Sequence, residues 1–131
     1  MKLLLTEEFP PAFAGGINKI AQLDQCNHCI GHIDEVYPQP PHTGSSWFHP
    51  ALRDGWMLLT MISDIKSHPQ NLALWKSTGL VVFFPTPSFA RLTFPSMAAS
   101  ILGQLSKLAD VYSQRNDGGT YRLDPTHIRM L

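Results

Sequence analysis

The hydrophobic and polar positions along the chain predict a mixture of strands and helices. The apolar run at residues 2–5 predicts a short strand. Residues 80–84 read Leu-Val-Val-Phe-Phe and form the clearest strand pattern, because all are apolar and residues 81–84 are β-branched or aromatic. Apolar and polar side chains alternate over residues 89–94, which predicts a third strand with one face in water. Residues 120–123 predict a fourth, short strand after the turn at 116–119.

Two segments carry the helical pattern. Residues 50–66 begin at a proline, which suits the first helical position, and they are apolar on most sides. Residues 96–113 repeat apolar side chains at i, i+3 and i+4 spacing, which predicts an amphipathic helix. A short helix is expected at 71–76, with Gly79 at its C-cap. Asp124 and Pro125 predict an N-cap followed by a first helical residue.

The remaining stretches predict loops or stay ambiguous. Residues 10–16 hold two prolines and two glycines and are expected to form a loop. Residues 17–33 fit a helix only in their first half. Residues 38–50, which are rich in proline and also hold Trp47 and Phe48, predict a long loop packed onto the body of the protein. With 131 residues, the chain fits one domain. We therefore predict a single α+β domain over residues 1–131, with a small, mainly antiparallel sheet on which helices 50–66 and 96–113 pack.

Composition and charge narrow the classes of function. Ten Lys and Arg residues balance ten Asp and Glu residues, and charged residues make up only 15% of the chain. A protein that binds nucleic acid through electrostatics needs a basic excess, so no nucleic-acid partner is expected. No apolar run approaches the roughly 18 residues of a membrane span. Two cysteines are too few for a disulfide-stapled secreted protein. The predicted location is the cytoplasm, with reduced thiols and without a membrane partner.

One cluster has the character of a metal site. Two cysteines and two histidines fall within seven positions, namely Cys26, His28, Cys29 and His32. A cysteine pair at this spacing can chelate zinc, and a nearby histidine can supply a third ligand. A closed structural site needs four ligands, so His42 or His49 would have to complete it. The second cysteine pair of the usual zinc signature is missing. The alternative, which we favour, is two ordinary buried thiols beside a surface histidine, so no cofactor is expected apart from this zinc hypothesis.

The segment at residues 28–49 also offers candidates for ligand binding and catalysis. His42, Trp47 and His49, together with Trp56, could line a pocket for a small apolar ligand. The alternative is that these aromatic side chains fill the core. Asp34 and Glu35 follow the first histidines, and such a set could serve general acid–base chemistry. Adjacent carboxylates are, however, commonly a solvated helix end.

The last two-thirds of the chain carry a resemblance. It runs from Gly44-Ser-Ser-Trp47 through the segment at 50–66 and the strand at 81–84 to Leu92-Thr-Phe94 and the helix that closes on Ala109-Asp-Val-Tyr112. This succession is similar to small uncharacterised bacterial α+β domains. The resemblance implies an accessory or immunity-type protein of the kind carried on mobile gene cassettes, and it assigns no active-site residue.

These observations predict a non-enzymatic binding or interaction protein. The alternative is a small-molecule-binding or hydrolytic protein that uses the histidine-rich segment 28–49. The strand at 80–84 is apolar on both faces, and the two main predicted helices most simply cover one of them. Either the segment 17–33 or a second copy of the protein covers the other face, and the low charged fraction favours the second copy. We therefore expect a homodimer with Val81 or Phe83 at or near its interface, in addition to a protein partner or a small apolar ligand.

Overall fold

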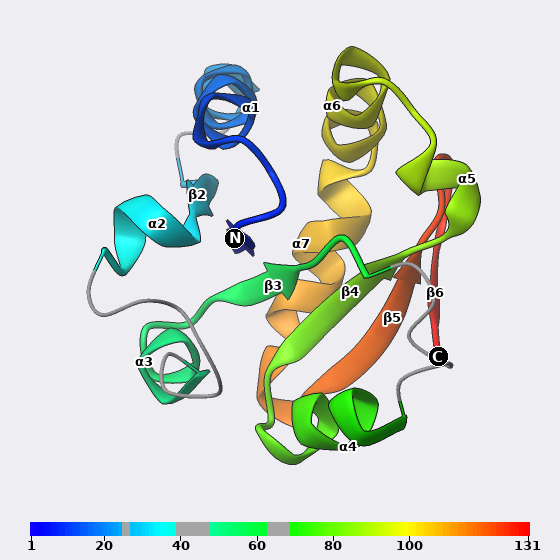
Figure 1. Cartoon of the computed structure of the whole chain (residues 1–131). Helices are drawn as coiled ribbons and strands as arrows, with labels where there is room; N and C mark the ends of the chain where they lie inside the picture. Colours follow the sequence, from blue (N-terminus) through cyan, green and yellow to red (C-terminus); the bar gives the residue numbers. More distant parts are fainter. Residues whose placement is uncertain (25–26, 39–47, 63–68) are drawn as a thin grey trace.

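A computed structural model of the chain describes residues 1–24, 27–38, 48–62 and 69–131 (Figure 1). Strands and helices follow one another along most of the chain. The strands are β1 (Lys2–Leu5), β2 (Cys29–His32), β3 (Met57–Leu59), β4 (Val81–Pro85), β5 (Gly119–Leu123) and β6 (Ile128–Met130). The helices are α1 (Pro11–Asp24), α2 (Ile33–Val36), α3 (Phe48–Arg53), α4 (Pro69–Ser77), α5 (Pro87–Ala90), α6 (Phe94–Gly103) and α7 (Leu105–Ser113), with a 3₁₀ turn at Arg115–Asp117.

The strands form one six-stranded sheet in the order β2-β1-β3-β4-β5-β6. Every neighbouring pair is parallel except β5 and β6. The chain therefore combines helices with a sheet, as the α+β class predicts, but the prediction of a mainly antiparallel sheet is wrong. The reason is that helical segments lie between most consecutive strands and carry the chain back across the sheet, which is what a parallel pair requires.

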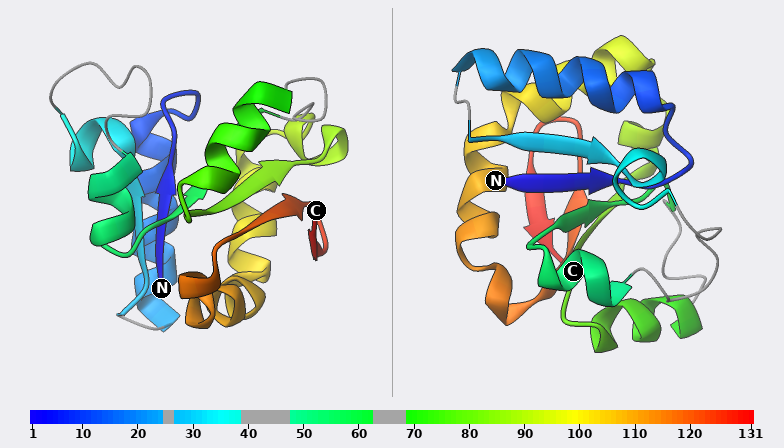
Figure 2. Two further views of the ribbon diagram at one scale, coloured as in Figure 1. Left: turned by 90° about the horizontal axis from the view of Figure 1, so that it is seen from below. Right: turned by 90° about the vertical axis from the view of Figure 1, so that its left-hand side faces the viewer.

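Helices cover both faces of the sheet (Figure 2). Leu3, Leu5, Met57, Leu59, Val81 and Phe83 face α1, α6 and α7 in the larger hydrophobic core. The alternate residues Leu4, Leu58, Val82 and Phe84 face α2, α3 and α4 in the second core. The ring of Phe13 lies 5.7 Å from that of Phe9 and 5.3 Å from that of Phe94, which ties α1 to α6 within the first layer. Because helices pack on both faces of the sheet, the parallel strands are apolar at consecutive positions.

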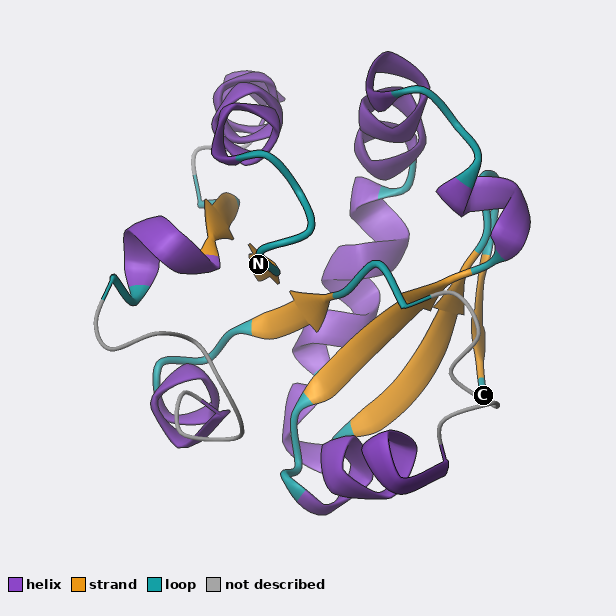
Figure 3. Cartoon of the chain, viewed as in Figure 1, coloured by secondary structure: helices purple, strands orange, loops and turns teal. Residues whose placement is uncertain are grey.

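The predicted helix at 50–66 is wrong between Asp54 and Ile62, and its last four residues, 63–66, lie outside the described residues. The helix α3 ends at Arg53, Gly55 follows with a φ of 82°, and Met57–Leu59 is a strand (Figure 3). A strand buried on both faces is apolar at every position, and over three residues this cannot be distinguished from one side of a buried helix. The short helix predicted at 71–76 is confirmed within α4, and Gly79 has a φ of 79° after it.

Four other predictions differ from the structure. Residues 89–94 are no strand, because Thr86 and Thr93 cap the helices α5 and α6 through their hydroxyls. Residues 10–16 are no loop, because α1 begins at Pro11, a residue suited to the first turn. The predicted helix at 96–113 divides at Gln104, whose amide donates to the carbonyl of Asp124 at 3.0 Å. Asp124 and Pro125 open no helix, and the chain turns there into β6.

The strand at residues 80–84 is covered within one chain. Val81 is 2% exposed and Phe83 is 0% exposed, both in the core beneath α6 and α7. Because helices of the same chain cover Val81 and Phe83, an uncovered face of this strand is no longer an argument for an interface there. The homodimer stays a prediction. In the parts of the chain that the structure describes, none of the helices has both the length and the apolar character needed to cross a bilayer.

Candidate functional site

A threonine follows directly after each of the strands β1, β3 and β4. These residues are Thr6, Thr60 and Thr86, and we call them the threonine row. Each backbone N–H donates to a neighbouring strand, to Leu59, Phe83 and Leu123 respectively, at 2.9–3.2 Å. The parallel register brings these strand ends to one edge of the sheet. This carboxyl edge is where open α/β sheets bind their ligands.

The three hydroxyls differ in their partners. The Oγ1 of Thr60 donates to the Glu8 carboxylate at 3.4 Å and accepts from the N–H of Ile62 at 3.3 Å. The Oγ1 of Thr86 donates to the Asp124 carboxylate at 3.0 Å and accepts from the N–H of Phe89. Thr6 is 3% exposed, and within the described residues its hydroxyl has no hydrogen-bond partner. A buried hydroxyl without a partner is costly, so this atom is a candidate to meet a ligand.

The sheet changes direction between β1 and β3. From β1 the chain crosses to β2 on one side, and it then returns past β1 to β3 on the other side. Such a switch point opens a crevice between the two connections that leave the sheet. Glu7 and Glu8 follow β1 at this point and are exposed, whereas Thr6 beside them is buried. The switch point therefore presents hydroxyls and backbone groups together with the carboxylates of one strand end.

His28 and His32, from the predicted metal cluster, are both buried, at 5% and 1% exposure. The Nε2 of His32 lies 2.6 Å from the carbonyl oxygen of Phe9, and its Nδ1 accepts from the N–H of Asp34 at 3.1 Å. A carbonyl can only accept, so His32 is neutral with its proton on Nε2. Both ring nitrogens are thereby used in holding β2, the β1–α1 connection and α2 together.

Cys29 and His32 belong to the same strand but lie on opposite sides of the sheet. Ile30, two residues before His32, belongs to the larger core, whereas Cys29 packs against the second core. The alternation of side chains along a strand explains this separation. Within the described residues, no group of three or more His, Cys, Asp and Glu side chains could hold a metal ion. Cys26 lies outside the described residues, so the zinc hypothesis that includes it stays a prediction.

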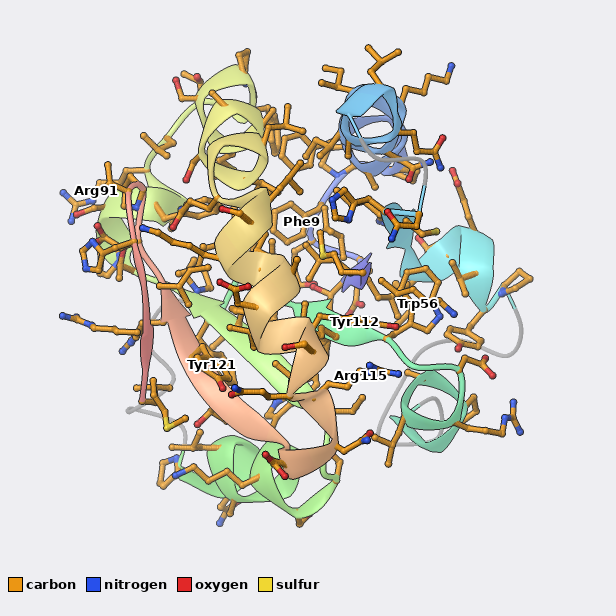
Figure 4. All side chains as sticks on the ribbon, turned by 180° about the vertical axis from the view of Figure 1, so that it is seen from behind. Phe9, Trp56, Arg91, Tyr112, Arg115 and Tyr121 are labelled. Atoms are coloured by element: carbon orange, nitrogen blue, oxygen red, sulfur yellow. The ribbon has the colours of Figure 1, made fainter. Side chains whose placement is uncertain are left out.

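The predicted ligand residues can be placed only in part. Trp56 is 7% exposed and belongs to the second core, with the ammonium of Lys2 4.5 Å above its ring (Figure 4). This placement agrees with the core alternative for Trp56. His42 and Trp47 lie outside the described residues, as does the side chain of His49. The structure therefore leaves a pocket of these four residues untested.

Sequence reasoning missed the threonine row because each of its members comes from a different strand end and is a common residue. A signal was nevertheless present. Thr6 follows an apolar run, Thr60 follows Met57-Leu-Leu, and Thr86 follows the clearest strand pattern in the chain. A polar residue directly after a buried parallel strand lies at the edge where ligands bind. The signal could be used only once the sheet was known to be parallel.

Comparison with protein families gave one match, to the family described as PIN like domain, over residues 1–86. The matched residues make up more than half of the chain and include β1 to β4 and the whole threonine row. The chain belongs to the PIN-like domain family. No curated protein and no solved structure matched it. The switch point lies inside the matched part of this PIN-like chain, whereas α5 to β6 lie beyond it.

Proposed function

We propose that this PIN-like domain is a non-enzymatic binding protein that recognises its ligand or partner at the carboxyl edge of the sheet. The observation that carries the proposal is the buried Thr6 hydroxyl at the switch point near Thr60 and Glu8, which has no hydrogen-bond partner in the part of the chain that the structure describes. Hydroxyls and backbone groups at such an edge fix the orientation of a ligand through hydrogen bonds. A bound polar group would satisfy the Thr6 hydroxyl and recover its desolvation cost.

The alternative is hydrolysis, since PIN-like domains are often nucleases. Metal-assisted hydrolysis needs carboxylates that converge on a cation. The described residues do not fit such a site. At the edge, the carboxylate of Glu8 accepts from Thr60, the carboxylate of Asp124 accepts from Thr86, and no group of three metal-ligating side chains forms among the described residues. Binding is the leading proposal because these contacts give the edge hydrogen-bonding groups that can orient a ligand.

The test asks whether the protein cleaves nucleic acid in the presence of a divalent metal ion. Purified protein is incubated with single-stranded RNA and DNA in the presence of Mg²⁺ or Mn²⁺, beside the variants Glu8→Gln and Glu35→Gln. Glu35 is an exposed carboxylate in α2, so the second variant is matched in charge. We expect no cleavage by any of the three proteins. Metal-dependent cleavage that Glu8→Gln abolishes and Glu35→Gln preserves would overturn the proposal.

The finer expectations belong to the same proposal. We propose an accessory or immunity-type role of the kind carried on mobile gene cassettes, in the cytoplasm and as a homodimer, on the strength of the resemblance, the composition and the low charged fraction. Light scattering at micromolar concentration tests the homodimer. A small-molecule or hydrolytic role for the segment 28–49 is the second candidate. It draws less support from His32, whose two ring nitrogens already hold Phe9 and Asp34.

A further inference from the structure

The connections that leave β1 and β2 bring carboxylates to one half of the carboxyl edge. The register pairs Leu5 with His32, so residues 6–10 and 33–38 leave two neighbouring parallel strands at the same end. In the right-hand view of Figure 2, α2 and the turn into α1 both lie at the tips of these strands. Neither stretch holds a lysine or an arginine. Their charged residues are all exposed carboxylates, namely Glu7, Glu8, Asp34 and Glu35.

The buried ring of His32 joins these two stretches. Its Nε2 donates to the carbonyl of Phe9, the residue after Glu8, at 2.6 Å, and its Nδ1 accepts from the N–H of Asp34 at 3.1 Å. The ring is neutral in this arrangement. It therefore fixes the two acidic stretches relative to each other without balancing their charge.

The charge of this half of the edge is not cancelled by the neighbouring connection. Residues 60–62, which leave β3, are uncharged. Of the segments outside the described residues, 39–47 holds no Lys, Arg, Asp or Glu, and 63–68 holds one aspartate and one lysine. Among the described residues, no lysine or arginine forms an ion pair with Glu7 or Glu8. Arg91, the C-cap of α5, lies on the other side of the molecule from α2 (Figure 4).

The hydroxyl of Thr6 lies at the base of this acidic half. The N–H of Thr6 donates to the carbonyl of Leu59 at 3.1 Å, which keeps the chain extended beyond β1. Thr6 follows Leu4 by two residues, so its side chain points to the face of the second core, where Leu4 packs with Ile33 of α2. The hydroxyl is buried and has no partner among the described residues. It is therefore an oxygen ready to accept a hydrogen bond beneath exposed carboxylates.

The carboxylate of Glu8 can share a ligand with this hydroxyl. Its Oε1 accepts from the hydroxyl of Thr60, which follows the neighbouring strand β3, at 3.4 Å. An ionised carboxylate has about four lone-pair sites, so this one bond leaves it free to accept others. Thr6 and Glu8 together offer oxygen acceptors and one negative charge. Asp34 and Glu35 add to the negative field and are not counted as ligands.

We propose that this edge binds an alkylammonium group, with the Thr6 hydroxyl and the Glu8 carboxylate as its acceptors. An ammonium is a compact positive charge with three N–H donors, whereas a guanidinium presents a planar fork that suits paired carboxylate oxygens. An anionic ligand would meet repulsion from the surrounding carboxylates. Lysine side chains and free polyamines both carry the group. The inference rests on the proposed function, because it names the chemistry of the ligand that the edge recognises.

The experiment measures amine binding without divalent metal. Calorimetric titrations use spermidine, a blocked peptide with as many lysines as spermidine has amines, and the same peptide with its lysines acetylated, which removes their charge. The variants are Glu8→Gln and Thr6→Val. Asp110→Asn is the control matched in charge, because Asp110 is an exposed carboxylate of α7 on the other face of the sheet. Circular dichroism checks that all variants are folded.

We expect the wild-type protein and Asp110→Asn to bind the amines alike. Glu8→Gln should bind about tenfold more weakly, since it loses a charge-assisted bond, and Thr6→Val about fivefold more weakly, since it loses a neutral one. The acetylated peptide should not bind. Tighter binding of the lysine peptide than of spermidine assigns the ammonium to a protein partner, and equal or weaker binding assigns it to a free polyamine.

Three results would overturn the inference. They are absence of binding by both amines, equal binding of the acetylated peptide, and a loss in Asp110→Asn as large as that in Glu8→Gln and Thr6→Val. If they occur while metal-dependent cleavage is also absent, only the inference fails. Cleavage that depends on Glu8 would overturn the proposed function instead, and the titrations without metal keep the two failures apart.

Discussion

The hydroxyl of Tyr37 donates a hydrogen bond of 2.6 Å to Oδ2 of Asp54, and the bond joins the end of α2 to the turn before β3. Burial raises the pKa of Tyr37, and the bond to the Asp54 carboxylate raises it further because the phenolate would face a negative charge. The same bond lowers the pKa of Asp54. The pair should therefore make stability depend on pH at both ends of the scale.

The two directions follow from linkage. A lowered pKa of Asp54 means that its stabilisation is present above the unfolded pKa, about 3.9, and is lost as the pH falls further. A raised pKa of Tyr37 means that its stabilisation is complete below the unfolded pKa, about 10, and is lost as the pH rises through the folded value. We measure the free energy of unfolding in urea at pH 3, 7 and 10.5. We expect Tyr37→Phe to reduce both the loss between pH 7 and 3 and the loss between pH 7 and 10.5. Tyr121→Phe is the control, and an unchanged pH profile of Tyr37→Phe would contradict the role of the pair.

The sequence predicted the fold best where one local signal was enough. Leu80–Phe84 is strand-like at every position, and β4 occupies residues 81–85. Gly79 ends α4 as a C-cap glycine should, with a φ of 79°. Met57–Leu59 failed because the same apolar run fits a buried helix, and only the parallel partners β1 and β4 decide for a strand.

The candidate site was harder to predict for a different reason. The cysteine and histidine cluster was conspicuous in the sequence, yet Cys29 and His32 lie on opposite faces of one strand. Thr6 and Thr60 are 54 positions apart in number and become neighbours at one edge only because β1 and β3 are parallel. The stretches 6–10 and 33–38 lie at one edge only because β1 and β2 are parallel neighbours, where the sequence left residues 17–33 ambiguous. Distant pairing cannot be read from local patterns.

Two glycines should respond to alanine in opposite directions. Gly55 has a φ of 82°, so Gly55→Ala should lower the free energy of unfolding by about 1–2 kcal/mol through backbone strain alone, because the new Cβ meets nothing closer than 3.5 Å. Gly15 lies inside α1, where a Cβ would meet nothing within 4 Å. Gly15→Ala should therefore raise the free energy of unfolding by about 0.5–1 kcal/mol. Urea unfolding measures both, and stabilisation by Gly55→Ala would show that the α3–β3 turn differs from this description.

A substitution at Phe83 tests whether helices of the same chain cover both faces of the sheet. Its side chain is fully buried and lies 5.5 Å from the ring of Tyr121. Phe83→Ala should cost about 3–5 kcal/mol of unfolding free energy at any protein concentration, because the lost contacts are within one chain. Leu23→Ala is the control at a side chain that is 87% exposed, and it should change stability by less than about 0.5 kcal/mol. A cost for Phe83→Ala that appears only at concentrations where the protein associates would place Phe83 in an interface.

His32 tests the zinc hypothesis. Nitrogen-15 NMR of the imidazole should show a proton on Nε2 and none on Nδ1, as the contacts with Phe9 and Asp34 require. Added Zn²⁺ should leave this pattern unchanged, since neither ring nitrogen has a lone pair available while both hydrogen bonds persist. His32→Ala should destabilise the fold by about 1–3 kcal/mol for the buried carbonyl of Phe9 that it leaves unpaired. Loss of the Nε2 proton signal on addition of one equivalent of Zn²⁺ would establish the metal site instead.

Thr6 and Thr60 offer the sharpest test of the proposed binding edge, because the same substitution should act in opposite directions. Thr6→Val keeps the shape of the side chain and removes a buried hydroxyl that has no partner among the described residues, so the free energy of unfolding should rise by about 1–3 kcal/mol. Thr60→Val removes a hydroxyl that is hydrogen-bonded to Glu8 and to the N–H of Ile62, so the free energy of unfolding should fall by about 0.5–1.5 kcal/mol. Urea unfolding of the protein without ligand measures both changes. If Thr6→Val stabilises the fold, the Thr6 hydroxyl carries a cost in stability that a binding role would explain. The binding proposal then also requires that Thr6→Val weakens the affinity for the ligand. If Thr6→Val destabilises the fold as Thr60→Val does, the Thr6 hydroxyl has a structural partner and the binding proposal loses the observation on which it rests.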